Sequence, residues 1–177
     1  MSDGMKDFLA TGYARYPDAC RVIVSFRDEV GARLSTALRR QREWGRFVPA
    51  RLGTPQWSDR SFWIVCMQSG TLDNSPAKIE LGLWWECPEV DAQVILFAGL
   101  NEGPGDCRLS DGPSAKFRYR EKRDYLYRPV GPDTVLEQVA GDLLTELFGR
   151  LPGAALHSPV IADGGGDTAD NAVARGP

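Results

Sequence analysis

The clearest pattern in the chain is an apolar stripe of helical period over residues 17–41. Apolar residues recur there at spacings of three and four, at Ala19, Val22, Ile23, Phe26, Val30, Leu34, Ala37 and Leu38. Pro17 and Asp18 suit the first turn of a helix, because this turn tolerates a missing amide hydrogen and favours a negative charge. The stripe therefore predicts a long amphipathic helix that begins at Pro17. Gly31, inside it, permits close packing of a neighbouring segment.

Downstream of this helix the pattern changes to that of strands. Extended segments occur at residues 46–52, 61–68, 78–86, 94–98 and 116–130. Pro49 restricts the first to an edge strand or no strand, since proline cannot donate a ladder hydrogen bond. Segment 78–86 alternates, with an apolar face of Ile79, Leu81, Leu83 and Trp85. The last segment is predicted to be one long strand or a hairpin. The links are too short for helical crossovers, so we expect an antiparallel meander of three to five strands.

A second amphipathic helix is predicted after the turn at Gly131 and Pro132. Asp133 or Thr134 is expected to cap its first turn, and its apolar stripe consists of Val135, Leu136, Val139, Leu143, Leu144, Leu147 and Phe148. Residues 154–177 are dominated by Gly, Asp, Ala and Pro, which bury too little apolar surface to offset the entropy of ordering. We therefore expect one α+β domain over residues 1–153, with both helices packed on the sheet, and a flexible tail over 154–177.

Composition places the chain among globular proteins. Of 177 residues, 42% are hydrophobic and 25% charged, and no apolar run approaches the roughly 18 residues of a membrane-spanning helix. The polar, acidic N-terminal residues lack the basic and apolar regions of a secretory signal. We therefore expect a cytoplasmic protein with no membrane partner. Arginine outnumbers lysine 17 to 4, which favours a GC-rich bacterial genome as the source.

The cysteines, the histidine and the carboxylates favour neither a metal site nor a catalytic triad. The cysteines, at positions 20, 66, 87 and 107, form no close pair of the kind that zinc sites use, and His157 is the single histidine. The usual nucleotide-binding, nucleophile and metalloprotease motifs are absent. Glu80 and Glu86, on one strand, would stand about 20 Å apart and cannot share an ion. We therefore expect buried, reduced thiols, no metal, no cofactor and, in preference to an enzyme, a binding protein.

Charge is segregated along the chain, although its net value is only −3. Residues 21–51 hold eight arginines and three acids, residues 116–130 hold six basic residues and two acids, and residues 71–111 and 133–177 are acidic. Such blocks arise either when oppositely charged segments pair within the fold or when a surface recognises a charged partner. Both explanations stay open from the sequence alone.

Three functions are compatible with these features. The leading hypothesis is a non-enzymatic protein that binds another macromolecule, above all a protein, as an adaptor, inhibitor or assembly factor, with homo-oligomerisation included. The alternative is a nucleic-acid-binding module that uses the basic strand 116–130, where basic and aromatic residues interleave, together with the Arg-rich helix. The third is an enzyme whose site has no local motif.

The candidate partner-binding residues are one tryptophan and six basic residues. Trp84 lies on the polar face of segment 78–86 with Glu80 and Glu86, and we expect its indole to be partly exposed as an interface anchor. If the second helix covers that face, Trp84 is a core residue instead. The basic candidates are Arg39, Arg40, Arg118, Arg120, Lys122 and Arg123.

Overall fold

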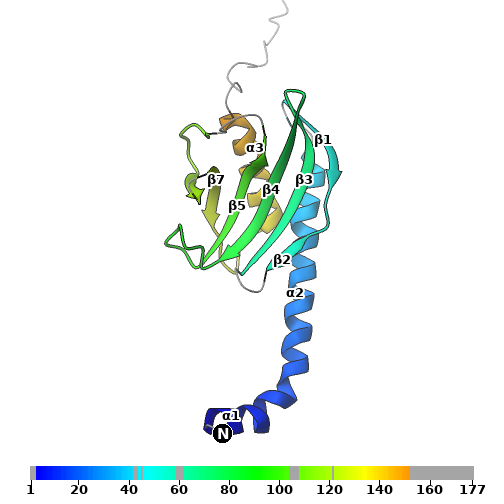
Figure 1. The fold of residues 1–177 in the computed structure, drawn as a ribbon, viewed down its shortest axis with the longest axis vertical. Coiled ribbons are helices and arrows are strands. Elements are labelled where there is room, and N and C mark those ends of the chain that lie inside the picture. The colour runs from blue at the N-terminus through cyan, green and yellow to red at the C-terminus, as the bar shows by residue number, and fades with distance from the viewer. Residues whose placement is uncertain are drawn as a thin grey trace, which may run out of the picture.

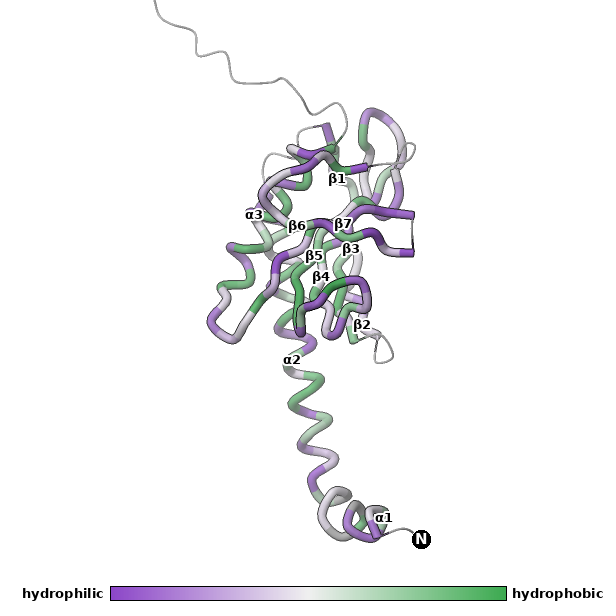
Figure 2. The backbone as a smooth tube through the Cα atoms, turned by 90° about the vertical axis from the view of Figure 1, so that its left-hand side faces the viewer, coloured by the Kyte–Doolittle hydropathy of each residue, from purple (hydrophilic) through white to green (hydrophobic). Residues whose placement is uncertain are grey.

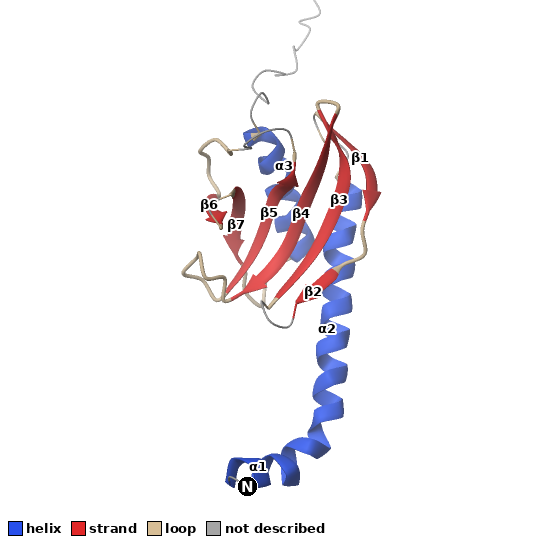
Figure 3. Ribbon diagram, viewed as in Figure 1, coloured by secondary structure: helices blue, strands red, loops and turns tan. Residues whose placement is uncertain are grey.

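The computed structural model describes residues 3–41, 44, 46–58, 62–103, 108–120 and 122–151. Helical elements open the chain: α1 (Asp3–Asp7), the π-helical η1 (Phe8–Gly12) and α2 (Tyr13–Arg40). The strands are β1 (Phe47–Leu52), β2 (Gln56–Ser58), β3 (Trp63–Leu72), β4 (Ser75–Trp85), β5 (Val94–Glu102), β6 (Ala115–Tyr119) and β7 (Arg123–Pro129), and α3 (Leu136–Arg150) follows them. Figures 1 and 3 show one sheet with α2 and α3 behind it, which confirms the expected α+β fold.

The strands form one antiparallel sheet in the order β1-β3-β4-β5-β7-β6, and β2 also pairs with β3. β3, β4 and β5 are a meander, whereas the next hairpin places β7 beside β5 and leaves β6 at the edge. β1 is an edge strand with a register shift between Pro49 and Arg51, as expected for a strand that contains proline. The seven strands exceed the expected three to five, because residues 116–130 form a hairpin and three-residue β2 is too short to show a pattern.

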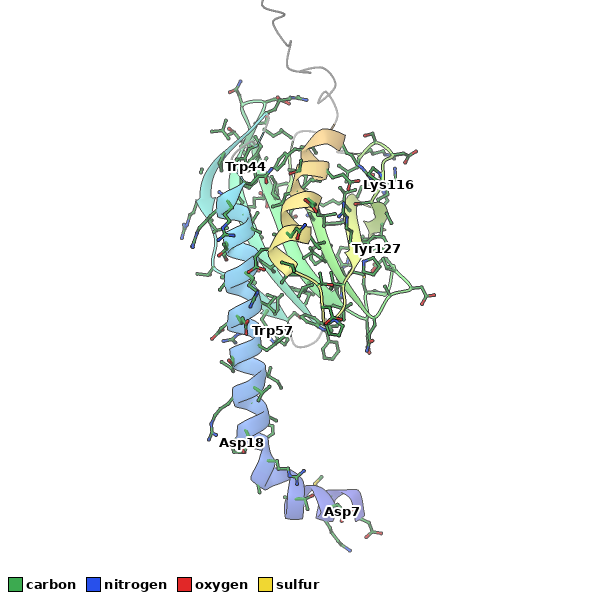
Figure 4. All side chains as sticks on the ribbon, turned by 180° about the vertical axis from the view of Figure 1, so that it is seen from behind. Asp7, Asp18, Trp44, Trp57, Lys116 and Tyr127 are labelled. Carbon is green, nitrogen blue, oxygen red and sulfur yellow. The ribbon has the colours of Figure 1, made fainter. Side chains whose placement is uncertain are left out.

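The main core lies between the sheet and the two helices, which Figure 4 shows side by side from behind. Its fully buried side chains include Leu34 and Leu38 of α2, Leu143, Leu144 and Leu147 of α3, and Ile64, Ile79, Leu81 and Leu96 of the sheet. The predicted apolar face of β4 is therefore the one that meets the helices. The predicted close approach at Gly31 is also confirmed, since a Cβ there would stand only 2.8 Å from the Pro55 Cβ.

The predicted helix boundaries are wrong at both N-termini. α2 begins at Tyr13 and is preceded by helical turns, so Pro17 lies inside the helix, where it removes only one backbone hydrogen bond near its start. The N-cap of α3 is Val135, without a side-chain hydrogen bond. Thr134 does not cap it, because its hydroxyl accepts a 2.9 Å hydrogen bond from the Gly131 amide and closes the preceding turn instead. The predicted tail over 154–177 lies outside the described residues.

Candidate functional site

The face of the sheet opposite the helices carries a second apolar cluster, made largely of aromatic rings. Alternation along β4 places Trp84 on this face, because its neighbours Leu83 and Trp85 belong to the helix-side core. The ring centres of Trp84 and Phe117 are 6.2 Å apart, and those of Phe117 and Tyr125 are 5.4 Å apart. These rings come from β4, β6 and β7 and contact one another. Together they form a continuous aromatic wall on this face of the sheet.

This wall encloses a cavity of about 330 Å³. The lining residues come from the six strands β2 to β7, and they are Gln56, Trp63, Val65, Met67, Glu80, Trp84, Phe97, Asn101, Phe117, Tyr119, Arg123 and Tyr125. We call this cavity the aromatic pocket. Trp63, Met67 and Tyr119 are half-buried, whereas Trp84, Phe117 and Tyr125 are buried behind them. The pocket is therefore open to solvent at a rim and closed by aromatic residues at its base.

Glu80 is the half-buried carboxyl group of the aromatic pocket. The Tyr125 hydroxyl donates to Glu80 Oε2 at 2.7 Å, and the Asn101 side-chain amide donates to Glu80 Oε1. Burial raises the pKa of Glu80 above its ordinary value, although these two donors oppose that shift. Burial and the neighbouring Glu80 carboxyl also raise the pKa of Tyr125. The Tyr125 hydroxyl is thus a fixed donor that orients the Glu80 carboxyl.

A glycine explains how the Tyr125 ring reaches Glu80. Gly99 of β5 pairs with Glu80 on one side and with Tyr125 on the other. A Cβ at Gly99 would collide with the Tyr125 ring, so the missing side chain leaves the space in which the ring lies across β5. The absence of a side chain at Gly99 therefore sets the position of the Tyr125 hydroxyl.

The expected partial exposure of the Trp84 indole is wrong. Trp84 is 8% exposed, and its ring centre stands 5.2 Å from that of Tyr119 and 6.0 Å from that of Phe97. The side chain is buried by aromatic residues of β5 and the β6–β7 hairpin, not by the second helix, which packs on the other face. Trp84 thus belongs to the base of the aromatic pocket.

The basic candidate residues fall into two separate places. Arg118, Arg120, Lys122 and Arg123 lie in the β6–β7 hairpin. Arg39 and Arg40 end α2, which packs on the opposite face, against β3, β4 and α3. Within the hairpin Arg118 pairs with Asp124 at 2.9 Å, and the Arg120 guanidinium lies 4.9 Å from the Tyr119 ring centre. The structure therefore does not join the hairpin and the helix end into one basic surface.

Part of the segregated charge pairs inside the fold. Arg33 of α2 contacts Glu137 of α3 at 3.3 Å, which joins a basic block to an acidic one. Arg128 of β7 contacts Glu146 of α3 at 3.2 Å, and Glu146 also pairs with the buried Arg150. These contacts support the internal explanation of the charge blocks for these residues.

The apolar stripe of α2 continues beyond the body of the protein. In its C-terminal half, residues 27–40, the stripe is buried, and Leu34 is 0% exposed. In its N-terminal half, residues 13–26, Val22 is 69% exposed, Ile23 52% and Phe26 45%. Figure 1 shows this half extending past the sheet, and Figure 2 shows hydrophobic and hydrophilic residues interspersed along it. We call residues 3–26, which comprise α1, η1 and this half of α2, the arm.

An apolar hollow lies where the arm meets the sheet. It measures about 320 Å³ and is lined by Val22, Ile23 and Phe26 of the arm and by Trp57, Phe62 and Trp85 of the body. The Phe26 ring centre is 5.8 Å from that of Trp85. Phe62, at the rim, has a positive φ of 49° and is exposed. This hollow therefore offers a surface for an apolar side chain from outside.

The described residues offer little for metal or thiol chemistry. They contain no group of three or more His, Cys, Asp and Glu side chains that could hold a metal ion. Cys66 and Cys87 are buried, as expected of small apolar residues, whereas Cys20 on the arm is only half-buried, so the prediction is wrong for that residue. Burial raises the pKa of Cys87 to about 11 and also raises that of Cys66, so neither is a reactive thiolate at neutral pH. Cys107 and His157 lie outside this part of the chain. No helix in the described ranges is long and apolar enough to cross a membrane.

Sequence reasoning missed two features of these sites. The sequence placed Glu80 on the polar face of segment 78–86, but alternation shows which face a residue takes and not what covers that face. The cover is the β6–β7 hairpin, whose Tyr125 is 45 residues away. The exposed half of the α2 stripe was expected to be core for the same reason. In each case the sequence showed an apolar or aromatic pattern, but the pattern does not show which surface packs against it.

Comparison of the chain with protein-family models, with curated proteins and with solved structures found no match in any of the three.

Proposed function

We propose that this chain is a cytoplasmic, non-enzymatic protein that works by binding another protein, and that the arm is its binding element. The observation that supports the proposal is the exposed continuation of the α2 stripe, with Val22 at 69% exposure. An amphipathic stripe whose apolar side chains stay largely exposed on their own chain is typical of helix-to-helix association. Most helices in proteins are stabilised by tertiary packing of their apolar face, so a partner that covers the exposed stripe would also stabilise the arm.

The partner segment that fits the arm is an amphipathic helix that carries both signs of charge, and a second copy of the arm is such a helix. Each arm holds three acids, Asp3, Asp7 and Asp18, and three basic residues, Lys6, Arg15 and Arg21. This balance lets two arms approach without net repulsion and form ion pairs between chains. Twofold dimers are also the commonest homo-oligomers. We therefore commit to self-association as the use of the arm to be tested first.

Sedimentation of the purified chain over a wide range of concentrations tests this proposal. Val22 lines the apolar hollow, and Val24 lies about 160° away around a helix of 3.6 residues per turn. We expect a concentration-dependent dimer for the natural chain and a dimer dissociation constant at least about tenfold higher for Val22→Asp. Val24→Asp, which makes the same chemical change on the other side, should leave the constant within about threefold of the natural value.

Two results would contradict the proposal. The first is a chain that stays monomeric at all concentrations. The second is equal weakening by both substitutions while circular dichroism at equal concentration shows that both variants keep their helix. The competing nucleic-acid function has less support, because Phe117 and Tyr125 are buried and Arg118 is paired. Binding of a short single-stranded oligonucleotide that weakens linearly in log salt would favour it instead.

A further inference from the structure

We propose that the aromatic pocket binds a small organic cation, an ammonium group on an aromatic or aliphatic body, with the Glu80 carboxylate as its counter-charge. This site is separate from the arm, since it lies on the sheet face opposite α2. Its cavity of about 330 Å³ is at the small end of the range of small-molecule pockets, about 300–1,000 Å³. The ligand is therefore a compact molecule rather than a peptide or a nucleic-acid strand.

The walls of the pocket supply the attraction for a cation. Trp63, Tyr119 and Met67 are its half-buried wall, and buried Trp84 lies at the base. The faces of tryptophan and tyrosine rings carry negative quadrupole charge, which attracts a cation within about 6 Å of the ring centre. Tyr119 already interacts in this way, because the Arg120 guanidinium stands 4.9 Å from its ring centre. The aromatic side chains of this pocket therefore suit a positively charged ligand.

Glu80 supplies the charge and the fixed geometry. An ionised carboxylate has about four lone-pair sites, and Tyr125 and Asn101 each use one. Lone pairs thus remain for an N–H donor of a ligand, on a carboxyl that its neighbours already hold in place. Burial raises the pKa of Glu80, which means that the ionised form lacks a sufficient compensating charge in the free protein. A bound ammonium group would provide that charge.

Arg123 limits what the pocket accepts. It is exposed at the rim, and its positive charge partly offsets the burial effect on the Glu80 pKa. A cation in the pocket would be repelled weakly by Arg123, because solvent screens a rim charge more than a buried one. An anion would be attracted to Arg123 but repelled by Glu80 and by the faces of the rings. The sum of these interactions favours a cation over an anion. Substitution of Arg123 tests this preference for a positively charged ligand directly.

Three probes of one shape and different charge test the proposal. Benzylamine, benzyl alcohol and benzoate share an aromatic ring and carry a positive, zero and negative charge at neutral pH. Isothermal titration calorimetry of the full chain with each probe gives its affinity, and quenching of tryptophan fluorescence reports entry into the pocket. We expect benzylamine to bind at least about tenfold more tightly than benzyl alcohol. Benzoate should bind more weakly still.

Matched variants then assign the charges. Glu80→Gln keeps the size of the side chain and should lower benzylamine affinity about tenfold or more, with little effect on benzyl alcohol. Arg123→Gln removes the like charge at the rim and should raise benzylamine affinity by a few-fold. Trp63→Leu should weaken benzylamine more than benzyl alcohol, because a cation–π contact is lost as well as apolar area. If Glu80→Gln fails to fold, Arg123→Gln and the pH profile still decide the question.

The pH profile provides an independent readout. The ionised carboxylate binds the cation, so benzylamine affinity of the natural chain should fall as pH is lowered through the raised pKa of Glu80. Glu80→Gln should abolish this fall. The proposal is overturned if benzoate binds more tightly than benzylamine and Arg123→Gln removes that binding, because the pocket would then be an anion site. It is equally overturned if the three probes bind alike or none binds.

Discussion

The two halves of α2 carry one continuous apolar stripe but meet different surroundings. Leu34, in the C-terminal half, is 0% exposed between the sheet and α3, whereas Ile23, three turns earlier, is 52% exposed. The residues are of the same kind and the spacing does not change. The body ends there, because the strands of the sheet that covers α2 do not extend along the arm, as Figure 3 shows. An amphipathic stripe therefore shows that one face of a helix is stabilised by burial. It does not show whether the same chain or another molecule buries it.

The largest effect that distinguishes the two halves is expected for Leu34→Ala. This substitution removes a fully buried side chain from the core and leaves a cavity, so the free energy of unfolding should fall by about 2–5 kcal/mol. Urea unfolding followed by far-ultraviolet circular dichroism measures the change. A loss below about 1 kcal/mol would mean that α2 does not pack on the sheet as described.

A smaller effect is expected at the boundary between the halves. Phe26 is 45% exposed, and its ring contacts Trp85 at one edge. Phe26→Ala should therefore reduce the free energy of unfolding of the monomer by about 1 kcal/mol, well short of a buried phenylalanine. The same urea experiment, at a concentration below any self-association, measures it. A loss as large as that of Leu34→Ala would show that the buried core extends into the arm.

The smallest effect is expected for Val22→Ala, which trims a side chain that is 69% exposed. In the monomer the free energy of unfolding should change by no more than about 0.5 kcal/mol. At concentrations that populate a dimer, the natural chain should gain stability with concentration and the variant should gain less, because a partner that binds the folded state stabilises it by mass action. A concentration-independent difference between the two chains would contradict an interface at Val22.

Much of the fold could be predicted from local patterns. The 3.6-residue period gave the two long helices, and alternation in β4 gave the face that Ile79, Leu81 and Leu83 turn to the core. Helix boundaries could not be predicted as well, because Pro17 is tolerated inside a helix that starts four residues earlier. β2 was missed, since its three residues contain no period.

The candidate sites depended far more on long-range contacts. Trp84 and Glu80 were correctly placed on the face away from Ile79, yet the partial exposure expected for Trp84 was wrong. Phe117 packs against Trp84 and Tyr125 donates to Glu80, and both residues come from the hairpin that follows β5 in the chain. Gly99, which makes room for the Tyr125 ring, looks in the sequence like any strand glycine.

The sequence by itself determined that there are two long amphipathic helices, that β4 alternates, and which face of each of these elements is apolar, because these depend on the period of the backbone and on neighbouring side chains. The tertiary structure alone decided which apolar faces are covered and by what. It buries Leu34, leaves Val22 outside, and turns Glu80 into the carboxyl of an aromatic pocket. The physical reason is that burial is a property of pairs of surfaces, and the second surface of each pair lies far away in the chain.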